Sequence, residues 1–370
     1  MLALDSRLKG KSIFLRESMI KFRDAKSMDL EICDAGYKPR ILNTNEQMIK
    51  ILEDMGVNHN YFLDLQAEEL KRLGLTASSA KNAARFLQIH SIGDRFDFPR
   101  FLRKLPDMEF SFQDDDFLTD VVETAVLIQL RTLKYKARFP VKDGYTLLGI
   151  MDETGILEEG QIFCIVEEDG EAKVITRSDG GNVIITRSPA LHPGDIQLAK
   201  AVTIPADSPL MQLRNCICFS QKGSRDLPSM LSGGDLDGDT YHIIFDVNLR
   251  PTQVFLPAEY AKQTPRKLTR LVQQKDMTDF FVDFMETDQL GRICNAHKII
   301  ADQSPEGVRD PNCIQLAEMA STAVDFSKTG IPVCRENCEY FGGLLNTHRS
   351  KETCQNIVTS VHILWRQDRT

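Results

Sequence analysis

The chain has 370 residues, of which 42% are hydrophobic and 26% are charged. This composition excludes a mainly disordered chain, and the length predicts two or three domains. A net charge of −8, from 45 basic and 53 acidic residues, argues against a nucleic-acid protein with a broadly basic surface. No segment approaches the roughly 20 apolar residues of a membrane span, and the first residues do not form a secretory signal. Nine cysteines without a compact framework indicate reduced thiols. We therefore expect an intracellular protein, in the nucleus or the cytoplasm, with no membrane partner.

In the first part of the chain, the spacing of apolar residues changes once, from strand-like to helical. Residues 12–16 alternate like a strand with no visible partner before them, so we expect residues 1–32 to belong to an incomplete domain. Residues 33–140 are predicted to be mainly helical, because apolar side chains recur at helical spacing in Met48, Ile51, Leu52 and Met55. A second helix is predicted over 120–138. Its basic end complements the helix dipole, with phosphate contact as the weaker alternative.

Residues 141–250 are predicted to form a compact β barrel or sandwich. Short strand-like runs alternate there with Gly, Pro, Asp and Ser, and leave no room for long helices between them. The predicted strands are 145–150, 161–166, 173–176, 182–187, 198–204, 215–219 and 240–245. Residues 251–370 become helical again, with a basic run over 265–275 and helices predicted over 278–302, 312–327 and 350–366. The fold class expected from this order is α+β.

The most informative segment is an acidic loop, Ser232-Gly233-Gly234-Asp235-Leu236-Asp237-Gly238-Asp239. Three carboxylates at alternating positions repel one another unless a cation lies between them. Oxygen ligands of this kind suit Mg²⁺, with Mn²⁺ as the second candidate, and the glycines allow the backbone to curl around the ion. Asp235, Asp237 and Asp239 are therefore the candidate metal ligands and catalytic residues.

Three other interpretations compete for this loop. An EF-hand would place Gly at the sixth position, where the chain has Thr240, and helices on both flanks, so a calcium-binding protein is disfavoured. A phosphatase-type nucleophile would end a hydrophobic strand, but Gly233 and Gly234 precede Asp235. A solvated acidic turn would explain one Asp-Gly pair but not three aspartates in a double-glycine frame.

Basic residues near the loop suggest what the metal would do. Arg187 ends a predicted strand and could bind a phosphate bidentately, through two guanidinium N–H groups. His192 could donate to a phosphate or sugar oxygen. Lys222 lies in a flexible cationic hairpin before the acidic loop. A metal, Arg187 and Lys222 together fit phosphoryl or nucleotidyl transfer, in which catalysis is mostly positioning and charge neutralisation.

At these residues the sequence resembles the eukaryotic RNA-dependent RNA polymerases of RNA silencing. The acidic loop and the block from Arg187 to Asp195 carry the resemblance, and segments 16–22 and 323–330 support it, so it covers nearly the whole chain. The resemblance implies a double-psi β-barrel core, with the second barrel complete over 141–250 and a remnant of the first barrel over 1–32. A helical insert over 33–140 and a helical neck or head region over 251–370 would complete the chain.

The resemblance also implies roles for individual residues. Asp235, Asp237 and Asp239 would hold the Mg²⁺ that activates the 3′-hydroxyl of the growing RNA, and a second Mg²⁺ would arrive with the nucleotide. Arg187 would lie near the nucleotide or the primer end, and Lys21 would face the triphosphate from the first barrel. For Asp325 and Lys328, which match a family segment, we expect a structural ion pair. The implied activity is synthesis of complementary RNA from nucleoside triphosphates on a single-stranded RNA template, giving double-stranded RNA and siRNA, with other silencing proteins as candidate partners.

The chain departs from the family in length. Members are far longer, and the Lys-Gly segment that the first barrel contributes does not precede Met1, so we expect a fragment or a truncated product. The alternative function is then an inactive module that binds RNA or a partner. A zinc site from Cys334, Cys338, His348 and Cys354 is disfavoured by its loose spacing, and Cys216 and Cys218 are expected to be packing residues. The negative net charge leaves room for a local basic cleft lined by Lys21, Arg187, Lys222 and the run 266–275.

Overall fold

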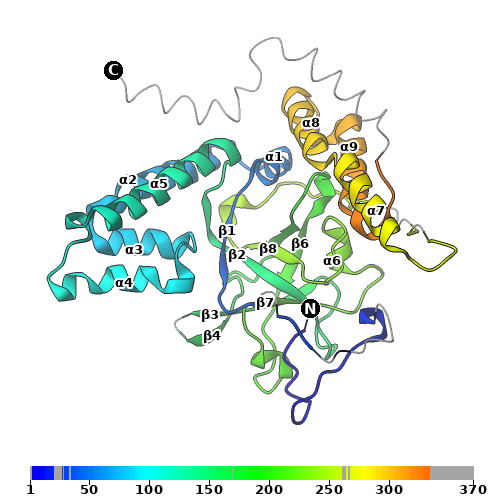
Figure 1. Cartoon of the computed structure of the whole chain (residues 1–370), viewed down its shortest axis with the longest axis horizontal. Helices are drawn as coiled ribbons and strands as arrows, with labels where there is room; N and C mark the ends of the chain where they lie inside the picture. Colours follow the sequence, from blue (N-terminus) through cyan, green and yellow to red (C-terminus); the bar gives the residue numbers. More distant parts are fainter. Residues whose placement is uncertain are drawn as a thin grey trace.

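The computed structural model describes residues 2–20, 27, 29–32, 35–168, 170–260, 264–265 and 267–333. At its centre lies a closed barrel, flanked by two groups of helices (Figure 1). The barrel strands, in the order in which they pair, are β2 (Pro140–Met151), β7 (Cys216–Phe219), β3 (Gln161–Glu168), β6 (Ile196–Ala201), β5 (Val183–Arg187) and β8 (Thr240–Ile244). The barrel closes because β2 pairs with β7 on one edge and with β8 on the other.

The barrel mixes parallel and antiparallel pairs. β2 with β7 and β3 with β6 are parallel, and the other neighbouring pairs in the ring are antiparallel. Two short strands extend the ring, β1 (Arg40–Asn43) beside β2 and β4 (Glu171–Val174) beside β3. All seven strands predicted over 141–250 form. Of the two predicted architectures, the structure has the barrel and not the sandwich.

Alternate residues of the strands fill the barrel. The buried cluster inside includes Leu147, Ile185, Ile217, Tyr241 and Ile243, each no more than 2% exposed. Because side chains alternate across a strand, their neighbours Ile184 and Ile244 point outward and join a second core with the helices. Each buried aliphatic side chain contributes about 1.5–3 kcal/mol relative to exposure, so both faces of these strands hold the barrel in place.

The first group of helices covers one side of the barrel (Figure 1). It contains α1 (Glu46–Asp54), α2 (His59–Gly74), α3 (Ala80–Ile89), α4 (Phe98–Lys104) and α5 (Asp116–Lys136). Asparagine, serine and aspartate side chains accept backbone N–H groups at the starts of α1, α2, α3 and α5. The helical prediction for this region is confirmed, with β1 as an added strand.

The second group contains α7 (Gln274–Thr287), α8 (Leu290–Gln303), α9 (Pro311–Val324) and α10 (Phe326–Thr329), and its α8 lies beside α1 of the first group (Figure 1). The single helix predicted over 278–302 is wrong, because the chain leaves the helix at Asp288 and Gln289 before α8 begins. A four-residue helix, α6 (Leu227–Met230), precedes the acidic loop. No helix in the described part of the chain is long and apolar enough to cross a membrane.

Short 3-10 helices connect these elements: η1 (Glu17–Met19), η2 (Thr76–Ser78), η3 (Asp94–Phe96), η4 (Pro106–Met108), η5 (Phe112–Asp114), η6 (Pro193–Asp195), η7 (Pro209–Gln212), η8 (Val247–Leu249) and η9 (Gly307–Arg309). The strand predicted over 12–16 is wrong. Those residues are irregular, residues 12–15 are exposed, and no neighbouring strand lies beside them among the described residues. The predicted helix over 350–366 and the candidate zinc ligands Cys334, Cys338, His348 and Cys354 lie outside the described residues.

Candidate metal centre

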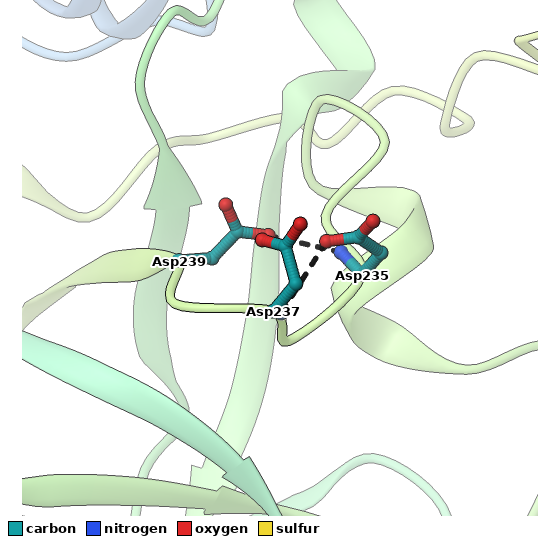
Figure 2. A group of neighbouring side chains, drawn as sticks. All are labelled: Asp235, Asp237 and Asp239. Carbon is teal, nitrogen blue, oxygen red and sulfur yellow. Dashed lines mark hydrogen bonds between the residues drawn. The ribbon is translucent and has the colours of Figure 1, made fainter. Parts of the chain in front are cut away.

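The acidic loop connects α6 to β8, and its three carboxylates gather on one side of it (Figure 2). One carboxylate oxygen from each of Asp235, Asp237 and Asp239 lies within 4.8 Å of the other two. Left-handed backbone at Gly233, Leu236 and Gly238 makes this curl, with φ of 70°, 62° and 141°. Gly233 and Gly238 adopt such angles without strain, whereas Gly234 leaves room for the Tyr241 hydroxyl, which an added Cβ would meet at 2.3 Å.

The carboxylates also brace the loop that carries them. The backbone N–H of Asp235 donates to Asp239 Oδ2 at 2.9 Å, and the N–H of Asp237 donates to Asp235 Oδ1 at 3.4 Å. Each carboxylate oxygen has more than one lone pair, so these bonds leave room for a metal ligand. The three aspartates therefore converge as predicted and offer the all-oxygen donor set of a hard divalent cation.

Arg187, the last residue of β5, ties the loop to the barrel. Its Nη2 lies 2.7 Å from Asp239 Oδ1, and its Nη1 donates to the carbonyl oxygen of Ser232 at 3.0 Å. The pair is largely shielded, with side-chain exposures of 18% for Arg187 and 10% for Asp239. Arg187 thus lies at the acidic loop and contacts a carboxylate there, while its role as a nucleotide ligand stays a prediction.

Lys328 of α10 supplies the second cation at the loop. Its Nζ lies 3.1 Å from Asp235 Oδ2 and 3.4 Å from Asp237 Oδ2. Burial opposes ionisation of Asp235, but hydrogen bonds from Lys328 and Asp237 outweigh it and lower the pKa of this carboxyl. The ion pair expected between Asp325 and Lys328 is therefore wrong: the Lys328 ammonium reaches the acidic loop, and only its backbone N–H bonds to the Asp325 carbonyl.

Tyr241 lies directly beneath the loop, inside the barrel. Its side chain is fully buried, yet its hydroxyl has no hydrogen-bond partner among the residues that the structure describes. The hydroxyl fits against the bare backbone of Gly234, where an added Cβ would come within 2.3 Å of it. Burial, followed by the negative charge of Asp239, raises the pKa of Tyr241 above its usual range. Within the described part of the chain, the neutral phenol is thus a buried donor without an acceptor, directly beside the carboxylates.

A cavity of about 750 Å³ opens beside the loop. Its walls come from the loop itself, from the segment before α6, from Tyr260 and from the small residues Ala317 and Ala320 of α9. Arg187, Arg225 and Lys328 face Asp226, Asp235 and Glu259 along its lining. The cavity is therefore lined by both basic and acidic side chains. The barrel and the second group of helices both contribute to its walls.

The other predicted phosphate ligands are turned to local partners. His192 Nδ1 accepts the N–H of Gly194 at 2.9 Å, and burial lowers the pKa of this imidazole. Lys222 Nζ lies 2.6 Å from Glu158 Oε1. Neither residue has a described contact with the three aspartates. Lys21 lies outside the described residues, so its place at the cleft stays a prediction.

The geometry also bears on the EF-hand alternative. Asp246, which would be the twelfth residue of the calcium loop, lies beyond β8 and accepts hydrogen bonds from Tyr61 and Asn248. The loop leads into β8 instead of a helix. The calcium-binding interpretation therefore lacks both its last ligand and its second helix.

Comparison with known proteins gives the family. A family model described as RNA dependent RNA polymerase matches residues 1–354. The chain belongs to this family. It is 31% identical to "Probable RNA-dependent RNA polymerase 1" of Oryza sativa subsp. japonica, over 86% of this chain and 42% of that protein. It is 35% identical to "RNA-dependent RNA polymerase 6" of Arabidopsis thaliana, over 88% of this chain and 28% of the relative.

A solved structure shares the fold. The "RNA dependent RNA polymerase QDE-1 from Thielavia terrestris" superposes with a TM-score of 0.59 at 20% identity, over 86% of this chain and 38% of that chain. With the closed six-stranded ring described above, this match confirms the α+β class and the double-psi barrel core with helical regions. The chain spans between about a quarter and two fifths of the length of these relatives.

The sequence alone missed two residues at this polymerase-family site. Lys328 lies 93 positions after Asp235, and the segment 323–330 that contains it was the only signal for its place. Tyr241 follows the acidic loop by two residues, but an aromatic residue in a strand usually indicates packing. Its unpartnered hydroxyl becomes visible only when Gly149 and Gly234 are seen against its ring.

Proposed function

We propose that the chain carries the metal-binding barrel of an RNA-directed RNA polymerase, which makes complementary RNA on a single-stranded RNA template. The observation that carries the proposal is the convergence of Asp235, Asp237 and Asp239 within 4.8 Å on a rigid barrel, in a chain of this family. When bound there, Mg²⁺ would activate the 3′-hydroxyl of the RNA and neutralise the phosphates, with Mn²⁺ as the alternative ion.

The residues of the chain would prepare this chemistry. The three aspartates would hold the metal, and Arg187 would fix Asp239 while presenting its remaining guanidinium edge to the nucleotide or the primer end. Lys328 would leave the carboxylates when the metal arrives and contact the phosphates of the incoming nucleotide. Lys21, His192 and Lys222 stay predicted nucleotide ligands. The biological role inferred from the family is double-stranded RNA production in silencing, in the nucleus or the cytoplasm, with silencing proteins as partners.

The test is RNA synthesis by the purified chain. We expect labelled complementary product from single-stranded RNA, nucleoside triphosphates and Mg²⁺, and loss of at least a hundredfold in rate for Asp237→Ala. Asp107→Ala removes an exposed carboxylate in the helical insert and should leave the rate unchanged.

Absence of product from the native chain, with RNA binding intact, would overturn autonomous activity. That outcome supports the alternative function, a module that binds RNA or a partner. Equal rates for the native chain and Asp237→Ala would instead remove the acidic loop from the mechanism.

A further inference from the structure

Asp195 is the most completely buried carboxylate near the acidic loop, and four hydrogen-bond donors converge on it. Its side chain is 0% exposed at the end of η6. Oδ2 accepts the backbone N–H groups of Leu191 and His192, each at 3.0 Å. Oδ1 accepts the N–H of Ser232 at 3.2 Å. The hydroxyl of Tyr260 lies 2.9 Å from Oδ1 and 3.0 Å from Oδ2.

The partners of Asp195 are matched to an ionised acid. The three N–H groups can only donate, and the Tyr260 hydroxyl can donate in the same direction, so the carboxylate accepts throughout. Burial still dominates its electrostatics and raises the pKa of Asp195 to about 6, against the lowering effect of these hydrogen bonds. A buried acid with this many donors organises the segments that supply them.

One of those segments is the start of the acidic loop. Ser232 has left-handed backbone with φ of 51°, and all its polar groups are engaged. Its N–H bonds to Asp195, its carbonyl accepts Arg187, and its hydroxyl donates to the carbonyl of Pro189. Asp235 follows three residues later, so the anchoring of Ser232 sets the direction in which the carboxylates emerge.

The segment that carries Tyr260 is itself held tightly against the barrel. It has no regular structure, yet the carbonyl of Phe255 accepts Gln197 and the carbonyl of Ala258 accepts Arg225. It passes so close to η6 that a Cβ on Gly194 would lie 2.0 Å from the carbonyl oxygen of Leu256. Tyr260 therefore approaches Asp195 from a fixed backbone and completes its shell of donors.

We propose that Asp195 and Tyr260 are positioning residues that hold the acidic loop in its metal-binding conformation. This inference rests on the proposed function for the metal itself. It makes the short block after Arg187 a support for the loop: η6 turns so that one carboxylate joins residues 191–192, Ser232 and Tyr260.

The test measures two properties of the full chain. Mn²⁺ binding is measured by titration calorimetry with the metal alone, and loop order is measured by hydrogen exchange of peptides covering 231–239. The variants are Asp195→Asn and the milder Tyr260→Phe. The matched control is Tyr61→Phe, which also removes a tyrosine hydroxyl from a buried aspartate, Asp246, at a site away from the acidic loop.

We expect the Kd for Mn²⁺ to rise about tenfold in Asp195→Asn and about threefold or more in Tyr260→Phe, with faster exchange over 231–239 in both. Tyr61→Phe should match the native chain in both properties. Unchanged loop exchange in Tyr260→Phe overturns the proposal, and so does faster exchange without loss of Mn²⁺ affinity. A native chain that binds no Mn²⁺ removes the metal from the proposed function. In that case, hydrogen exchange over 231–239 still tests whether Asp195 holds the loop in place.

Discussion

Lys328 shows how a single side chain can stand where a metal ion would act. Its ammonium contacts Asp235 and Asp237, which are two of the three candidate ligands, and its side chain is 57% exposed. Exposed ion pairs of this kind contribute only about 0.2–1 kcal/mol each. The lysine therefore neutralises the loop without binding it strongly, and a divalent cation can displace it.

We predict that Lys328→Ala raises the affinity of the chain for Mn²⁺ by a factor of about 2–5, because the metal no longer competes with a resident cation. The gain should shrink as ionic strength rises, since the contacts are exposed and screened by salt. Calorimetric titration at two salt concentrations measures both effects. Lys222→Ala is the control, as its partner is Glu158. A loss of affinity in Lys328→Ala would mean that the lysine preorganises the carboxylates.

At the scale of elements, the sequence predicted what local pattern determines. The strands over 141–250 were recognisable because alternation and turn residues mark both ends of each. The convergence of Asp235, Asp237 and Asp239 was predictable because all three lie within five residues of one loop. The failures share a different cause. The predicted strand at 12–16 has no partner among the described residues, and Lys328 and Tyr260 reach the site through tertiary contacts that no local pattern records.

Gly149 of β2 allows the ring of Tyr241 of β8 to pack closely against the backbone of β2. A Cβ added to Gly149 would lie 2.3 Å from Cε2 of Tyr241, well inside contact distance, and the tyrosine ring is fully buried against Phe219. The ring cannot retreat, because its other edge meets Gly234 under the acidic loop. The barrel interior and the acidic loop are therefore coupled by the position of one aromatic side chain.

We predict that Gly149→Ala lowers the free energy of unfolding by about 1–3 kcal/mol, the usual cost of overpacking a core. The shifted ring should also disturb the acidic loop and weaken Mn²⁺ binding. Denaturant unfolding and metal titration measure the two effects. Gly291→Ala serves as control, because Gly291 lies in α8 with open space at its Cβ. That variant should gain up to about 1 kcal/mol from helix propensity. Equal stability of the two variants would contradict the packing argument.

At the scale of the whole molecule, the local charge at the candidate site differs from the net charge of the chain. The chain carries a net charge of −8, yet the candidate site gathers Arg187, Arg225 and Lys328 beside its acids. Net charge alone argues against a nucleic-acid partner, whereas the proposed function has RNA as its partner. Two histidines in the interior of the chain are a further electrostatic feature of the molecule. His242 lies on β8 and His297 on α8, and burial lowers the pKa of each to about 4.

We predict that these histidines make the fold sensitive to mild acid. Both are neutral in the folded chain, whereas the unfolded chain takes up protons near pH 6.5, so stability falls as pH drops from 6.5 towards 4. The expected slope is roughly 1 kcal/mol per pH unit for each histidine. Denaturant unfolding at pH 7, 6 and 5, with EDTA present, should show a shallower slope for His242→Gln and for His297→Gln than for the native chain.

The exposed His59→Gln variant is the control and should keep the native slope of stability against pH.

Asp195 affects the pH dependence of stability in the opposite direction. Its raised pKa of about 6 means that, as pH falls, the folded chain binds a proton before the unfolded chain does. That contribution is common to all the variants and cancels in the comparison of slopes. The two histidines lie in different parts of the molecule: His242 bonds to Thr146 and Ser188 in the barrel, and His297 lies on α8 in the second group of helices. Slopes that stay identical in all three variants would show that neither histidine is neutral in the folded state at pH 5.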